Sequence, residues 1–290
     1  MGLYMKRSPL LPLSVKLGRT AFQLLNLSST QRELLSSSWG VFSPTQIDPS
    51  LSHSSSQFDE WVIDFKLGPP PKSCRPHYQR LHDVSIEFDL KTKQVMSWID
   101  GSLGAIEATL QIILQWSLHS RGGLLVHASA GIYQESGILV PGESGAGKST
   151  VAREAGFDRV LSDEMVIIER EQSTISTNHT PSSYRLYSSP FWSEGRTLPI
   201  VRDSAPLSLI AFPHQSTFAK LSPCSEGQAI SQLLRAVTVY ERQDHNEQAH
   251  HQLTDLFEIT CHLCTVTPHA NLAFPKRGPW ADSVFGQILI

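Results

Sequence analysis

The chain has few cysteines, no long apolar run and little net charge. Its 290 residues include four cysteines, and the net charge is −3. Four scattered cysteines argue against a disulfide framework and are typical of a reducing compartment. A charge so close to neutral does not favour nucleic acid as a partner. No apolar stretch reaches the ~18 residues of a membrane span, so we expect a cytoplasmic protein without a membrane partner.

The N-terminus lacks the long apolar segment of a signal peptide, because Pro9 and Pro12 interrupt its leucines. Residues 43–57 are rich in serine and proline, which is typical of a linker. Alternating apolar residues predict strands at 61–66, 84–90 and 95–99, and helical spacing predicts a helix from Leu103. We therefore predict an N-terminal extension with a polar linker (1–58), a small β-rich region plus helix (59–121) and a nucleotide-binding domain (122–290).

The predicted fold class is α/β or α+β. Within residues 122–290, apolar runs predict strands at 124–130, 137–140, 159–161, 165–169 and 207–212, and periodicity predicts helices at 148–154 and 226–239. These elements suggest a phosphate-loop core with a mixed sheet flanked by helices. The small region before it is expected to form an antiparallel sheet.

A glycine-rich segment carries the strongest functional signal. It matches the full G-x-x-x-x-G-K-[ST] pattern between a predicted strand and a predicted helix. Its residues are Gly142, Glu143, Ser144, Gly145, Ala146, Gly147, Lys148, Ser149 and Thr150. Glycines let backbone N–H groups surround an anion, Lys148 offers a cation to the β and γ phosphates, and Ser149 offers a hydroxyl to Mg²⁺. A chance glycine-rich turn is the alternative, but so complete a pattern favours binding of ATP with Mg²⁺.

An acidic pair follows soon after this segment. Asp163 and Glu164 end the predicted strand 159–161, with room for only one short helix between them and the loop. Carboxylates at that position can hold Mg²⁺ or accept a proton from a hydroxyl. A solvated surface turn is the competing interpretation. His127, in the strand before the loop, is either a core histidine or a member of the same site.

The order of His127, the glycine-rich segment and the acidic turn resembles the HPr serine kinase/phosphorylases. The resemblance covers residues 122–166 and extends to HPr-kinase-related proteins of bacterial gene clusters. It implies a fold related to the nucleotide core of phosphoenolpyruvate carboxykinases, a serine-type acceptor, Asp163 as base or metal ligand, and His127 beside it. The later Glu-Ile-Arg-Gly-Leu-Gly segment of those enzymes has no counterpart here, so the acceptor stays open.

Three functions remain under consideration. The first is an ATP-dependent kinase acting on a hydroxyl of a protein, peptide or small molecule, with Lys148, Asp163 and His127 as catalytic residues. Ser149, Asp163 and Glu164 are the predicted Mg²⁺ ligands. The second is a nucleotide-binding regulatory module without transfer activity, and the third is a carboxykinase-like lyase. A homo-oligomer is compatible with all three.

Other motifs carry weaker signals. Cys261 and Cys264 could bind zinc with nearby histidines, although two partly buried thiols in an apolar segment are the commoner outcome. Residues 188–194 combine proline with aromatics, as in a lid or an acceptor-binding loop. Three basic residues are candidate phosphate clamps, namely Arg196, Arg202 and Lys220.

Overall fold

The protein consists of two compact units. The computed structural model describes residues 12–42, 59–74, 76–80, 83–171, 183–192, 198–199, 201–240 and 247–286. The chain divides at residue 109, so that unit 1 covers residues 1–109 and unit 2 covers residues 110–290. The boundary lies inside helix α2 (Leu103–His119). No helix in these described ranges is long and apolar enough to cross a membrane.

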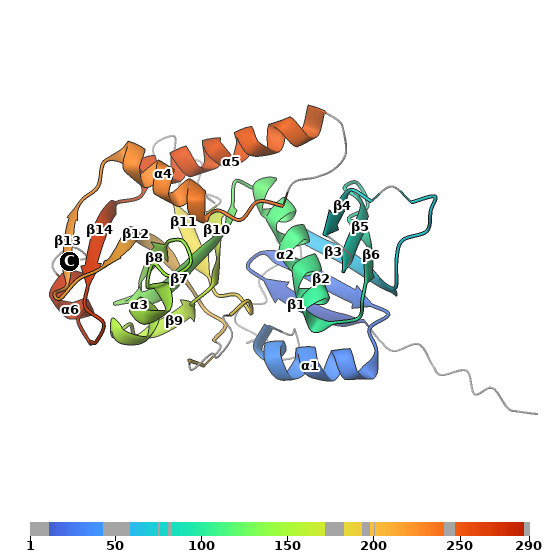
Figure 1. The fold of residues 1–290 in the computed structure, drawn as a ribbon, viewed down its shortest axis with the longest axis horizontal. Helices are drawn as coiled ribbons and strands as arrows, with labels where there is room; N and C mark the ends of the chain where they lie inside the picture. The colour runs from blue at the N-terminus through green and yellow to red at the C-terminus, as the bar shows by residue number, and fades with distance from the viewer. Residues whose placement is uncertain are drawn as a thin grey trace, which may run out of the picture. The chain divides into compact units, whose positions relative to one another are not determined.

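Unit 1 is built on a six-stranded mixed sheet with the strand order β1-β2-β3-β6-β5-β4 (Figure 1). The strands are β1 (Leu13–Leu17), β2 (Thr20–Leu25), β3 (Asp59–Leu67), β4 (Tyr78–Arg80), β5 (Val84–Asp89) and β6 (Gln94–Ile99). In β3, Trp61, Ile63 and Phe65 are buried while their neighbours are not, which is the period of a strand with one face in the core. Helix α1 (Ser29–Trp39) and the 3₁₀ helix η1 (Gly40–Phe42) follow β2.

Two features of unit 1 differ from the sequence prediction. Part of the predicted N-terminal extension is folded, because β1, β2 and α1 all lie within residues 13–39. The predicted antiparallel sheet is mixed, because β3 runs parallel to both β2 and β6. Local periodicity detects a strand but does not determine its direction relative to segments far away in the chain. The prediction of an antiparallel sheet was wrong for this reason. The linker predicted at residues 43–57 lies outside the described residues.

Unit 2 contains a closed barrel of five strands. They are β7 (Leu124–Tyr133), β8 (Ser136–Pro141), β10 (Met165–Arg170), β11 (Tyr184–Tyr187) and β12 (Ser204–Gln215). β7 pairs with β8 and β10, β12 pairs with β8, and β11 closes the ring by pairing with both β10 and β12. Strand β9 (Arg159–Ser162) pairs with β7 beside β10. The strands β14 (His269–Phe274) and β13 (Lys220–Pro223) extend the sheet beyond β12.

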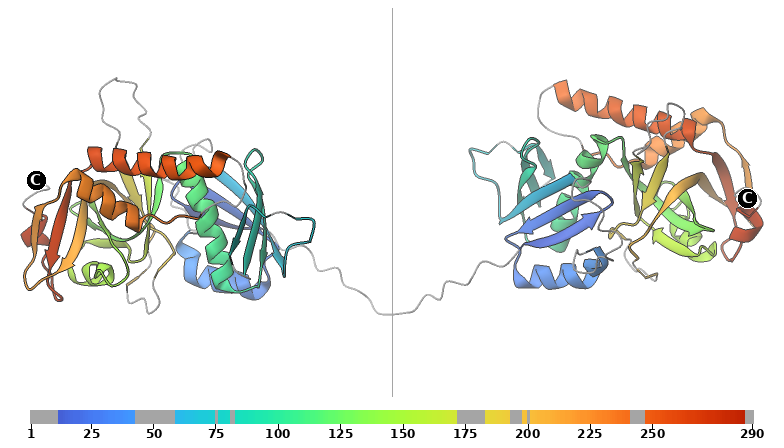
Figure 2. Two further views of the ribbon diagram at one scale, coloured as in Figure 1. Left: turned by 45° about the horizontal axis from the view of Figure 1, so that its top comes forward. Right: turned by 180° about the vertical axis from the view of Figure 1, so that it is seen from behind.

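Helices cover the strands of unit 2 on two sides. Helices α4 (Glu226–Ala236) and α5 (Glu247–Val266) lie on one side and α3 (Lys148–Glu154) on the other, as Figures 1 and 2 show. The side chains of β8 alternate between two apolar clusters: Leu139 packs in the cluster with α4 and α5, whereas Ile138 and Val140 pack with α3 and α6 (Ala281–Val284). A mixed α+β architecture with helices on a mixed sheet is therefore confirmed.

Candidate functional site

The glycine-rich segment connects β8 to α3, which is the strand–loop–helix order expected from the sequence. Two of its glycines have backbone conformations that side-chain-bearing residues rarely adopt, with φ of +83° at Gly145 and +98° at Gly147. A methyl group on Gly147 would lie 2.4 Å from Cζ of Phe274. The loop therefore requires glycine at residue 147 for two reasons, the backbone conformation and the close approach of Phe274.

Lys148 is the central cation of the site and is only 6 % exposed. Its Nζ donates a hydrogen bond to the Glu143 carbonyl oxygen at 3.0 Å, so the side chain folds back over the loop. Burial lowers the pKa of Lys148, and the charges of Glu164 and Asp163 oppose that shift. Both predicted acids are therefore within electrostatic range of this lysine. Ser149 and Thr150 are half-buried in the first turn of α3.

The acidic turn lies between β9 and β10, and both strands pair with the same edge of β7. Ser162 fixes the turn, because its Oγ accepts hydrogen bonds from the backbone N–H groups of Glu164 and Met165, each at 3.3 Å. The Glu164 carbonyl accepts from the Ala128 N–H at 3.0 Å. Asp163 is 7 % exposed. The turn is therefore held to β7 by backbone hydrogen bonds, with Asp163 buried and the Glu164 side chain 38 % exposed.

His127 connects the loop to the turn. Its carbonyl accepts a hydrogen bond from the Gly142 N–H at 3.4 Å, and its Nε2 lies 3.4 Å from Oε1 of Glu164. Burial and the Lys148 charge lower the pKa of His127, whereas Glu164 acts in the opposite direction. The side chain is 31 % exposed, so it is not a core histidine. The structure thus brings together His127, Lys148 and the acidic turn, as the sequence suggested.

The weaker sequence candidates do not join this cluster. Cys264 is buried, and burial raises its pKa to about 12. Among the described residues, no group of three or more His, Cys, Asp or Glu side chains could hold a metal ion. A zinc site at Cys261 and Cys264 therefore gains no support, although the side chains of His250 and His251 lie outside the described part.

Mg²⁺ needs fewer protein ligands than zinc, commonly one or two carboxylates with phosphates and water. Ser149, Asp163 and Glu164 suit that donor set.

The predicted lid segment is partly packed against the barrel. Phe191 is buried, Ser189 donates a hydrogen bond through its Oγ to the Met165 carbonyl, and Trp192 Nε1 donates to the Ser189 carbonyl at 2.7 Å. Residues 193–197, including Arg196, lie outside the described ranges. Burial lowers the pKa of Arg202, and Lys220 is exposed on β13. Arg202 and Lys220 stay predictions as phosphate clamps.

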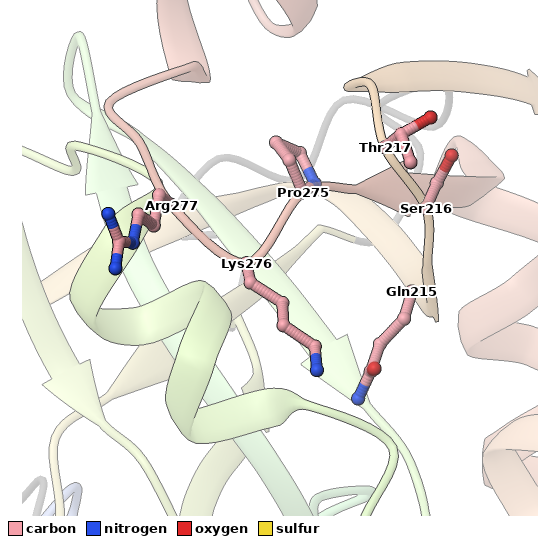
Figure 3. A pocket seen from close by; sticks show the side chains of 6 residues that line it. All are labelled: Gln215, Ser216, Thr217, Pro275, Lys276 and Arg277. Atoms are coloured by element: carbon pink, nitrogen blue, oxygen red, sulfur yellow. The ribbon is translucent and has the colours of Figure 1, made fainter.

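Sequence reasoning missed a pocket of about 580 Å³ beside the loop (Figure 3). Two short segments line it, one after β12 and one after β14. The lining residues are Gln215, Ser216, Thr217, Pro275, Lys276 and Arg277. The available signal for this pocket was the pair Lys276 and Arg277, which follows the apolar strand β14. Nothing in the local sequence related this pair to residues 215–217, which come some sixty positions earlier.

The site and fold define an α+β protein with a glycine-rich loop beside an acidic turn. A family model described as SynChlorMet cassette protein ScmC matches residues 93–284. The match covers more than half of the chain and includes the loop, His127 and the acidic turn, so the chain belongs to the ScmC family. No curated protein sequence matches the chain.

The family match corrects the resemblance to HPr serine kinase/phosphorylases. The family found is ScmC and not an HPr kinase family. The resemblance rested on residues 122–166, where the spacing of a glycine-rich loop and an acidic turn is dictated by chemistry that many protein classes share. A short segment of that kind identifies a chemical arrangement and not a family.

Proposed function

We propose that the protein binds ATP with Mg²⁺ through residues 142–150 and transfers the terminal phosphoryl group to a hydroxyl of a protein, peptide or small molecule. One observation carries the proposal: a buried lysine lies at the glycine-rich loop within electrostatic range of the two acids of the turn. A cation for the phosphates and carboxylates for the metal or the proton are therefore in one place. Phosphoryl transfer depends almost entirely on such positioning and charge stabilisation.

The roles follow from the chemistry of each group. The backbone N–H groups of the loop, together with Lys148, would hold the β and γ phosphates, and the Ser149 hydroxyl would contact Mg²⁺. The acceptor oxygen forms a bond to the γ phosphorus while the bond to the β–γ bridging oxygen breaks, so that ADP leaves. The acceptor proton passes to Asp163 if that carboxylate is the base, and Glu164 then serves the metal.

His127 has a positioning role in this proposal. Its lowered pKa favours the neutral imidazole, whose Nε2 can hydrogen-bond to Glu164 without adding a second cation beside Lys148. The histidine would thereby hold the Glu164 carboxylate toward the loop. Because the contact is 3.4 Å and partly exposed, its contribution to stability is small.

The low exposure of Asp163 favours a second candidate, a nucleotide-binding module without transfer. A general base must reach the proton that it removes, and Asp163 is only 7 % exposed. In that case Asp163 would serve only as a metal ligand or as a structural group of the turn.

The expected absence of nucleic-acid and membrane partners, and the cytoplasmic location, stay predictions from the sequence.

Asp163→Asn separates the two candidates. The side chains are nearly isosteric, so binding of Mg·ATP measured by calorimetry should remain, whereas transfer from γ-labelled ATP to serine-containing peptides should fall about 10²–10⁴-fold. Glu135→Gln is the matched control, because it makes the same acid-to-amide change at a side chain that is 87 % exposed. If the wild-type protein binds ATP but transfers its phosphoryl group neither to an acceptor nor to water, the result would support the nucleotide-binding module without transfer activity. Near-normal transfer by Asp163→Asn would exclude Asp163 as the base.

A further inference from the structure

The pocket beside the loop lies on the opposite flank from the acidic turn. β8, which leads into the glycine-rich loop, is paired on one side with β7 and on the other with β12. The acidic turn belongs to strands on the β7 side. The pocket lies at the ends of β12 and β14, and both strands run parallel to β8, so their carboxyl ends meet the loop at the same edge of the sheet.

Direct packing places the pocket-lining segments against the loop and α3. A methyl group on Gly142 would lie 3.6 Å from Cγ of Pro213, two residues before the pocket residue Gln215. Phe274, which immediately precedes the other lining segment, approaches Gly147. The N–H of Ser216 donates to the Phe274 carbonyl at 2.8 Å, which ties the two segments together.

The far end of the second segment is also fixed. The N–H of Gly278 donates to Oε2 of Glu154 at 3.3 Å, and Glu154 is the last residue of α3. Residues 275–277 therefore run alongside α3 from its beginning to its end.

The chemistry of the pocket suits a nucleoside. Its walls combine the apolar ring of Pro275 with an amide at Gln215, which carries both a donor and an acceptor for the edge of a base. In Figure 3 the polar ends of Gln215 and Lys276 converge from the two segments.

We propose that this pocket binds the base and ribose of the nucleotide whose phosphates lie in the glycine-rich loop. The inference rests on the proposed function, since it assumes that residues 142–150 hold the phosphates. It gives the nucleotide one direction: its terminal phosphate faces Lys148 and the acidic turn, and its nucleoside faces the ends of β12 and β14. Lys276, whose ammonium group converges with Gln215 in Figure 3, adds positive charge to the pocket.

The test compares a nucleotide with its phosphates alone. Calorimetry on the full chain would measure the affinities of Mg²⁺ complexes of ATP, GTP, CTP and UTP and of inorganic tripolyphosphate. We expect the tightest nucleotide to bind at least about tenfold more tightly than tripolyphosphate. Thr217→Trp, which fills the pocket from an exposed position, should remove most of this difference and leave tripolyphosphate affinity unchanged. Ser231→Trp, on an exposed position of α4, is the control and should change neither affinity.

Each result decides between the two proposals. Equal affinity of wild-type protein for tripolyphosphate and all four nucleotides would overturn the pocket assignment and leave phosphate binding standing. An unchanged nucleotide preference in Thr217→Trp would overturn it as well. Failure of every ligand to bind would overturn the proposed function together with the pocket. If circular dichroism shows that Thr217→Trp does not fold, Gln215→Ala replaces it: a several-fold loss for the nucleotide alone supports the assignment, and no loss contradicts it.

Discussion

Replacing Gly147 with alanine tests the geometry of the loop through stability alone. The residue has a φ of +98°, where an L side chain costs about 1–2 kcal/mol. The added methyl would also lie 2.4 Å from Cζ of Phe274, which is fully buried and therefore has little room to move. Overpacking of this kind costs about 1–3 kcal/mol. The two contributions predict that Gly147→Ala lowers the free energy of unfolding by about 2–5 kcal/mol.

Gly145→Ala is the matched control in the same loop. Its φ is +83°, so the backbone cost is similar, but no atom outside its chain neighbours lies within 4 Å of the added methyl. We expect a loss of only about 1–2 kcal/mol. The difference between the two variants therefore measures the contact with Phe274.

Urea denaturation would give the stabilities, and hydrogen exchange of β8 and α3 amides would show that unit 2 is the part affected. Combining Gly147→Ala with Phe274→Leu, which removes the obstructing Cζ, should cost less than the sum of the two single changes. Equal losses for Gly147→Ala and Gly145→Ala, or strict additivity in the double variant, would refute the close approach of Phe274 to the loop.

Three further outcomes are expected. Lys148→Ala should weaken binding of Mg·ATP at least about tenfold, because a hydrogen-bonding cation facing the phosphates is lost, and unchanged affinity by calorimetry would refute the site. His127→Ala should reduce transfer less than Asp163→Asn does and leave the thermal midpoint nearly unchanged, since the side chain is partly exposed; a large drop in the midpoint would instead assign it to the core. Burial lowers the pKa of His119 from 6.5 to about 4, so the unfolded state binds more protons between these values and stability should fall as pH falls through that window. His119→Leu should flatten this part of the pH profile in denaturation experiments, and a slope unchanged from wild type would contradict the assignment.

The elements of unit 2 around the site were predictable because their signals are local. The predicted helix 148–154 coincides with α3, and the predicted strands 137–140, 159–161 and 165–169 match β8, β9 and β10 to within one residue at each end. A complete glycine-rich pattern also needs no tertiary information to be recognised. His127 lies near the loop because a tight turn at Gln134 and Glu135, both with positive φ, returns the chain antiparallel to itself.

Other elements carried local signals that were overlooked. Strand β1 alternates Leu13, Val15 and Leu17, but the prolines before it favoured an unstructured interpretation. Helix α1 begins with a capping box in which Ser28 and Gln31 bond to each other's backbone N–H groups. Both features could have been recognised by inspection of the sequence.

The remaining features could not be derived from one sequence. Closure of the barrel depends on β11 pairing with two strands that are distant from each other in the chain. The pocket depends on the parallel pairing of β12 with β14, which brings together residues separated by an entire helical hairpin. Family membership required comparison with related sequences, because the short site motif is shared too widely to decide it.

Strand β7 restricts how sequences of this family can vary in length. One edge pairs with β10 and β9 in succession, the other edge pairs with β8, and the loop and the acidic turn each adjoin one of these partners. A single inserted residue in β7 would exchange its two buried faces beyond that point, moving side chains such as Ala130 from one apolar environment to the other. Insertions and deletions should therefore accumulate in the connections between strands and leave the number of residues from His127 to Gly131 constant, which aligned ScmC sequences would reveal directly.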